Sequence, residues 1–286
     1  MRTNRHLFFR AVWWGANVLL VTVVVSSLYA GFREYSVRKY LKGFSDAVVP
    51  ETASPEQKVE AILGWMRSGP ARYVAANPAE LPARDPQTTL NYRQLLTVCG
   101  TATNAFLNLG RSGGLNVRRL LLLTPELNTK HVVAEVLIDG RWIIVDPAYR
   151  VILRNARGQM LTRDQLRNPT VFREATSAVP GYPSNYNYDH YAHVRLARLS
   201  LYGLGLRRIL DGALPGWDEI TNWNLLLERE SFLVLVISVC LTLFFLLLRL
   251  GLAWYADRRL RIARFHLREH ALRAGVAFFS TPEIKQ

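Results

Sequence analysis

Two long apolar stretches constrain the fold of this 286-residue chain more than any other feature. Residues 11–32 contain no charged side chain over 22 positions, and residues 231–248 contain none over 18 positions. A helix of about 20 apolar residues crosses the ~30 Å hydrocarbon core of a bilayer, and lipid offers no partner for free backbone groups. We therefore predict one membrane helix at residues 11–32 and a second at residues 231–256, in which Arg249 reaches towards the interface.

The basic residues predict how these helices are oriented. The chain has a net charge of +14, and seven of its arginines lie between positions 249 and 273. Cytoplasmic flanks of membrane helices carry such an excess, and long segments translocate largely regardless of charge. We predict that residues 1–10 and 257–286 are cytoplasmic and that residues 33–230 face the periplasm or the outside of the inner (cytoplasmic) membrane. Membrane lipid then explains the basic charge, and no nucleic-acid partner is expected.

A cysteine precedes a predicted helix in the segment between the two apolar stretches. Apolar side chains follow it at helical spacing, namely Ala102, Ala105, Phe106 and Leu109. The glycines at 113–114 end the helix. Cys99 therefore lies at the first turn, where free N–H groups and the helix dipole favour a thiolate.

A histidine and an aspartate fall on one predicted hairpin. Two apolar runs flank Asp139-Gly140, a strong signal for a two-residue type I′ turn. This turn pairs Ile138 with Arg141, Leu137 with Trp142, Glu135 with Ile144 and Val133 with Asp146. Because side chains alternate between the faces, His131 and Asp146 share a face, about 7–8 Å apart between backbones.

A thiol, a base and a carboxylate are the parts of a nucleophilic triad. We assign Cys99 as nucleophile, His131 as base and Asp146 as the group that orients the base. The backbone N–H of Gly100 and the amide of Gln94 are candidates for holding the oxyanion, and Trp142 and Tyr149 are candidate substrate contacts. This chemistry requires neither a metal nor a cofactor. The structural alternatives are a small buried cysteine, a structural histidine and a turn-capping aspartate.

In this order and spacing, the chain resembles the transglutaminase-like superfamily of papain-like cysteine peptidases, amidases and acyl transferases, here in a membrane-anchored bacterial type. The matching pieces are Cys99 opening a helix, G-L-N-V-R-R from Gly114, Glu135 four residues after His131, and G-R-W-x-x-V-D-P from Gly140. The resemblance covers roughly residues 51–166. It implies an α+β domain in which the cysteine helix packs on an antiparallel sheet. Val133 stands where many relatives carry an aromatic residue, and Gln94 is not adjacent to Cys99, which disfavours crosslinking activity.

Three further segments of the chain show recognisable sequence patterns. Ser54-Pro55-Glu56-Gln57 has the form of a capping box before a helix, and residues 71–86, with three prolines, form a predicted loop beside the substrate groove. Residues 180–196 are rich in tyrosine and include His190 and His193. We favour a hydrogen-bonding surface against the domain there over a metal site.

We predict an α+β transglutaminase-like domain, with its core at about residues 51–200, held outside the membrane between two helices. The first functional hypothesis is a hydrolase or acyl transferase that attacks an amide or acyl carbonyl of a peptide, protein or glycopeptide at the cell envelope. The second is a binding module in an envelope or polysaccharide assembly that has lost turnover. The third is a structural membrane subunit with a vestigial triad. The sequence does not predict the oligomeric state.

Overall fold

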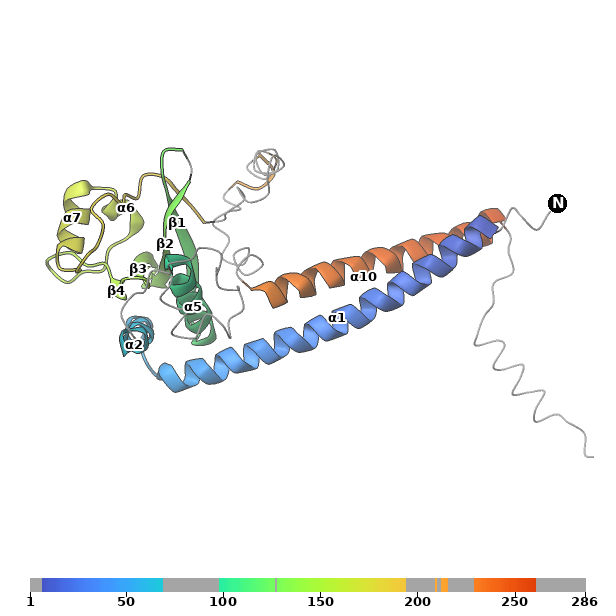
Figure 1. Cartoon of the computed structure of the whole chain (residues 1–286), viewed down its shortest axis with the longest axis horizontal. Coiled ribbons are helices and arrows are strands. Elements are labelled where there is room, and N and C mark those ends of the chain that lie inside the picture. Colours follow the sequence, from blue (N-terminus) through green and yellow to red (C-terminus); the bar gives the residue numbers. More distant parts are fainter. Residues whose placement is uncertain are drawn as a thin grey trace, which may run out of the picture. The chain divides into compact units, whose positions relative to one another are not determined.

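The computed structural model describes residues 7–68, 98–126, 128–193, 209, 212–215 and 229–260 (Figure 1). The predicted loop at 71–86, Gln94 and the tail beyond residue 260 lie outside these residues. The chain divides into two compact units, residues 1–27 with 238–286, and residues 28–237. The second unit is an α+β domain with an antiparallel sheet, as the sequence predicts.

A five-stranded sheet forms the centre of this domain, in the order β4-β3-β2-β1-β5. Its strands are β1 (Val117–Leu123), β2 (Thr129–Ile138), β3 (Arg141–Asp146), β4 (Val151–Ile152) and β5 (Tyr191–Ala192). Neighbouring strands pair antiparallel throughout.

The β2–β3 hairpin has the predicted register. Ile138 pairs with Arg141, Leu137 with Trp142 and Glu135 with Ile144. Asp139 and Gly140 have φ angles of 49° and 75°, and both central residues of a type I′ turn require positive φ. The turn therefore decides which side chains of β2 and β3 share a face.

Each face of the sheet is covered by a separate hydrophobic cluster. On one face lie helix α2 (Pro55–Ser68) and helix α5 (Cys99–Ser112), with Leu63 and Phe106 packed among Ala134, Val136 and Val145. The predicted capping box begins α2, since Ser54 and Gln57 exchange backbone-to-side-chain hydrogen bonds of 2.9 and 3.3 Å. On the other face lie helices α6 (Arg163–Leu166) and α7 (Pro169–Ser177), with a second cluster that includes Leu120, Val133, Ile144 and Tyr188.

Two helices among the described residues are long and apolar enough to cross a membrane. They are α1 (Leu7–Val48) and α10 (Glu230–Tyr255), and the π-helical turn η4 (Ala256–Leu260) follows α10. In the first unit, the hydroxyls of Ser27 and Thr242 lie 2.9 Å apart. The Nε of Arg249 donates to Oδ1 of Asn17 at 2.8 Å, so this arginine has a partner within the protein rather than only at an interface.

The second half of α1 is a core helix of the α+β domain. Val37, Leu41 and Val49 are 5%, 0% and 5% exposed and pack in the same cluster as α2 and α5. The Oγ of Ser45 donates to the carbonyl of Leu109 on α5 at 3.2 Å. This packed region therefore begins N-terminal to residue 51, where the sequence placed the start of the core.

A buried ionic cluster links Glu34 on α1 to Asn108 on α5 through Arg229. Glu34 accepts hydrogen bonds from Arg38 (2.8 Å), Arg229 (2.8 Å) and Ser231 (2.6 Å). Arg229 also donates through Nη2 to Oδ1 of Asn108 at 3.1 Å. Because Glu34 and Arg229 are only 2% and 5% exposed, removing one of them would leave the other charge buried without its main partner.

Candidate active site

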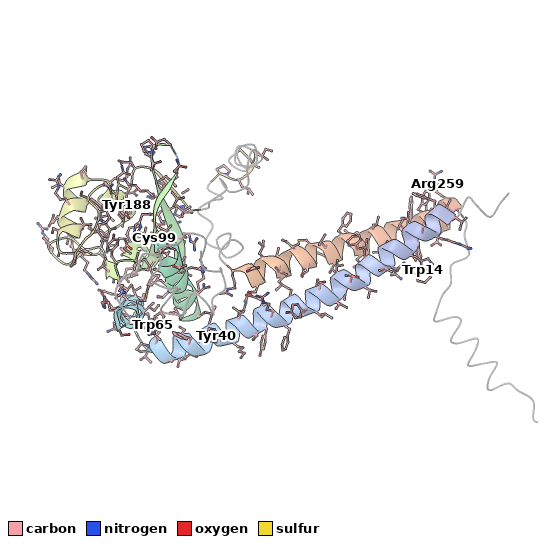
Figure 2. The ribbon with its side chains drawn as sticks, in the orientation of Figure 1. Trp14, Tyr40, Trp65, Cys99, Tyr188 and Arg259 are labelled. Carbon is pink, nitrogen blue, oxygen red and sulfur yellow. The ribbon has the colours of Figure 1, made fainter. Side chains whose placement is uncertain are left out.

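Cys99 is the first residue of α5 (Figure 2). The preceding residue, Val98, is extended, and its carbonyl accepts a hydrogen bond from the hydroxyl of Thr101 at 2.8 Å, which closes the first turn. The backbone N–H groups of Cys99 and Gly100 belong to this first turn. Thr103 anchors the helix to β2 by donating to the carbonyl of Val132 at 3.0 Å. The half-buried thiol therefore lies at the positive end of a fixed helix.

His131 and Asp146 form a buried hydrogen-bonded pair across the hairpin. The Nε2 of His131 lies 2.7 Å from Oδ2 of Asp146, and both residues are 0% exposed. The other carboxylate oxygen accepts from the backbone N–H groups of Ala148 (3.0 Å) and Tyr149 (3.3 Å). The chain turn after β3 thus holds the carboxylate in place while the imidazole reaches it from β2.

The environment of His131 favours its charged form. Burial lowers the pKa of this imidazole, but the charge and hydrogen bond of Asp146, with a smaller contribution from Cys99, outweigh burial and raise the pKa to about 9. Cys99 packs against a small apolar cluster that includes Val132, the residue after His131. The Nδ1 of His131 is buried and has no hydrogen bond of ordinary geometry to any described residue. An imidazolium next to a thiol at a helix start favours a thiolate–imidazolium ion pair.

Three tyrosines surround the His131–Asp146 pair. The hydroxyl of Tyr182 donates to Oδ2 of Asp146 at 2.9 Å. The ring of Tyr186 stacks on the imidazole, with centroids 4.4 Å apart and an angle of 13° between the planes. Tyr149 meets the imidazole edge-on at 6.0 Å. The sequence predicted a tyrosine surface in this region, but it did not identify Tyr182 and Tyr186 as neighbours of the base.

The structure does not bring Trp142 to this site. It lies four residues before Asp146 on β3, which corresponds to about 13 Å of strand. The guanidinium of Arg118 lies over its ring, 4.0 Å from the centroid. Trp142 therefore packs near the hairpin turn, whereas Tyr149 lies beside the imidazole.

A second histidine–carboxylate pair lies on the same face of the sheet. The Nε2 of His193 is 2.8 Å from Oε2 of Glu135, and Arg118 donates through Nε to the same oxygen at 2.6 Å. Burial raises the pKa of Glu135, but the hydrogen bond from His193 and the charge of Arg118 outweigh it and lower the pKa. His193 is thus paired with a carboxylate. No group of three His, Cys, Asp or Glu residues within the described ranges could hold a metal ion.

Residues 42–147 match the family model of the transglutaminase-like superfamily. The chain contains a transglutaminase-like domain. The match includes Cys99, His131 and Asp146 and ends directly after the aspartate. Neither the curated proteins nor the solved structures contain a match to the chain. Tyr182 and Tyr186, which lie beside Asp146 and His131, are beyond the matched residues, and so is His193, which binds Glu135.

Proposed function

We propose that the transglutaminase-like domain is a cysteine enzyme that acts on an amide or acyl carbonyl, with Cys99 as nucleophile, His131 as base and Asp146 as the residue that orients the base. The observation that carries this proposal is the buried 2.7 Å contact between His131 and Asp146, with Cys99 at the start of α5 beside it. A nucleophile, a base and a third group that fixes the base are the recognised arrangement for covalent acyl chemistry.

The geometry supports a two-step reaction. The thiolate of Cys99 attacks the carbonyl carbon, and the electron pair of the C=O bond moves to oxygen, which the first-turn N–H groups of α5 stabilise. The carbonyl re-forms as the bond to the leaving amine breaks, and the imidazolium of His131 gives that amine its proton. A water molecule or an acceptor amine then attacks the thioester and loses a proton to the imidazole, and the thiolate leaves. Water gives hydrolysis, and an amine gives acyl transfer.

We further infer that α1 and α10 hold the domain at the outer face of the cytoplasmic membrane, with both chain ends inside. The length and apolar character of the two helices support membrane insertion. The arginines at positions 249–273 support the orientation. The substrate would then be a peptide, protein or glycopeptide of the cell envelope.

A binding module without turnover is the alternative function. The observation that favours it is the complete burial of His131, whose ring is covered by Tyr186. A base must come within hydrogen-bond reach of the proton that it transfers. The enzyme therefore requires the leaving group to approach the imidazole from the side of Cys99, whereas the binding module has no such requirement.

One labelling experiment tests the reaction and the location together. The chain has two cysteines, so Cys240→Ser leaves Cys99 as the sole thiol. In cells with an intact cytoplasmic membrane, a membrane-impermeant maleimide at about pH 6 should label this protein rapidly. An ordinary thiol with a pKa of about 8.5 is almost fully protonated there. Adding His131→Ala should slow labelling at least tenfold, and Cys99→Ala in the same background should abolish it.

Two outcomes contradict separate parts of the proposal. Labelling that requires permeabilised cells would reverse the orientation of the domain. Equal labelling rates with and without His131, with an ordinary pH dependence in both, would make Cys99 a structural residue and leave the binding module as the better function.

A further inference from the structure

The carboxylate of Asp146 is held by four donors, and one of them is a side chain 36 residues further along the chain, the hydroxyl of Tyr182. Oδ1 accepts from two backbone N–H groups of the turn after β3. Oδ2 accepts from the imidazole of His131 at 2.7 Å and from the hydroxyl of Tyr182 at 2.9 Å. The backbone donors fix one oxygen, so the orientation of the other, which meets the base, depends on Tyr182.

Tyr182 is suited to act as a permanent donor at this position. Burial, together with the nearby Tyr188 and Asp146, raises its pKa well above the ordinary value of 10.0, so the phenol stays neutral and keeps its proton. Its ring is fixed by neighbouring rings, with the centroid 4.5 Å from Tyr149 and 5.8 Å from Tyr186. The hydroxyl therefore approaches the carboxylate from a constrained ring rather than from a free side chain.

We propose that Tyr182 is a positioning residue for His131, which acts by holding the carboxylate of Asp146 in the orientation that the imidazole requires. This inference rests on the proposed function of the triad. It extends the working site beyond residue 147, into the segment between α7 and β5. In this mechanism Tyr182 acts through Asp146 and not on the substrate.

The hydrogen bond has a measurable electrostatic consequence. Without the phenol, Oδ2 of Asp146 keeps its contact with His131 but loses its second donor. The carboxylate should then hold the imidazolium of His131 less firmly, since hydrogen bonds to a charged acceptor are among the stronger ones. The thiolate of Cys99 would lose part of the support of its partner and would be protonated at a higher pH.

Other titratable groups face this pair as well. They are Cys99 from α5, Tyr149 from the turn after β3, and Tyr182, Tyr186 and Tyr188 from the segment before β5. Of these tyrosines, Tyr182 has the hydroxyl that donates to Asp146. A Tyr→Phe change at position 182 therefore removes the donor and keeps the packed ring.

The test uses the full-length protein with Cys240→Ser, and it measures the rate of Cys99 alkylation by iodoacetamide between about pH 4 and pH 8. The acid limb of this profile is the pH range in which the rate falls because the thiolate becomes protonated. In Tyr182→Phe, the acid limb should move to a pH higher by roughly one unit. Replacing Tyr182 by 3-fluorotyrosine, whose more acidic phenol is a stronger donor, should move the limb down. A purely structural tyrosine would not produce opposite shifts from these two changes.

Tyr191→Phe is the matched control. Tyr191 lies on β5, and its ring packs under the guanidinium of Arg163 at 3.9 Å. The same loss of a hydroxyl there should leave the acid limb unchanged.

The inference and the proposed function fail in different ways. If the parent protein shows a low-pH reactive thiol and both changes at position 182 leave its acid limb in place, Tyr182 has no positioning role and the triad stands. If the parent protein alkylates as an ordinary thiol, the triad itself is wrong. Should Tyr182→Phe not fold, the fluorotyrosine protein decides the matter alone, because it adds one fluorine atom to an otherwise unchanged side chain.

Discussion

The domain carries two buried histidine–carboxylate pairs on one face of one sheet, and they differ in one respect. In both pairs Nε2 of the imidazole contacts the carboxylate, at 2.7 Å for His131–Asp146 and 2.8 Å for His193–Glu135. All four residues are at most 1% exposed. His131 and Glu135 stand four residues apart on β2, so the two pairs are neighbours on that face.

The difference lies in what else each carboxylate binds. Glu135 is also bound by the guanidinium of Arg118 at 2.6 Å, so its charge is already shared with a permanent cation. Asp146 receives its further hydrogen bonds from neutral donors, the backbone and Tyr182. Its charge therefore remains available to a protonated imidazole. A histidine paired with a carboxylate thus suits the proposed base in one place and a structural ion cluster in the other, according to whether an arginine is present.

Turnover should separate the two pairs most strongly. Asp146→Asn keeps the shape of the side chain but lets it hold the wrong tautomer of His131, so we expect turnover to fall by roughly 10–10³ with little change in KM. Glu135→Gln should change turnover less than about threefold. A panel of activated esters and peptides would supply the assay. Equal losses of turnover in the two variants would contradict the assignment of a catalytic role to the first pair and a structural role to the second.

Stability should separate them in the opposite sense. Glu135→Gln leaves Arg118 buried without a counter-charge, and breaking such a pair typically costs about 3–5 kcal/mol. Asp146→Asn leaves no such permanent charge behind and should cost roughly 1–2 kcal/mol. Denaturant midpoints of the purified protein in detergent would compare the two variants. A larger loss of unfolding free energy for Asp146→Asn would show that Asp146 contributes more to stability than Glu135 does.

The pH dependence of stability gives the smallest and most specific contrast. The pKa of His131 is raised from 6.5 to about 9, so its contribution is fully present below pH 6.5 and is lost as the pH rises towards 9. The pKa of Glu135 is lowered from 4.5, so its contribution is present above pH 4.5 and is lost as the pH falls below that value. We expect Tm to decline by a few degrees, roughly 2–6 °C, at each end.

Two variants assign these declines. His131→Gln should flatten the alkaline decline alone, and Glu135→Gln should flatten the acid decline alone. An alkaline decline that persists in His131→Gln would assign it to another group.

Local signals in the sequence were enough to predict the hairpin, its register and the helix behind Cys99. Asp139-Gly140 specifies a turn with positive φ at both positions, and the alternation of side chains then places His131 beside Asp146. The identity of the donors around that pair could not be predicted in the same way. Tyr182 is 36 residues from Asp146 in the chain, and its approach depends on how the segment after α7 packs back on the sheet.

The partners of charged residues were also out of reach of sequence patterns. His190 and His193 invited comparison with a metal site, but His193 is bound to Glu135 from a strand 58 residues earlier. Arg229 lies directly before α10, and no sequence pattern assigned it a partner. It binds Glu34 across 195 residues. Such contacts depend on tertiary packing, which no local periodicity records.

Helix α1 has a consequence for how the domain can be cut out of the chain. It is one unbroken helix from Leu7 to Val48, apolar and exposed in its first half, and it contributes Val37 and Leu41 to the core of the domain in its second. A soluble fragment cut at residue 42, where the family match begins, would lose Val37 and Leu41 from the core and Glu34 from Arg229. On the N-terminal side, a protease that released the domain with this part of its core intact would therefore have to cut within α1.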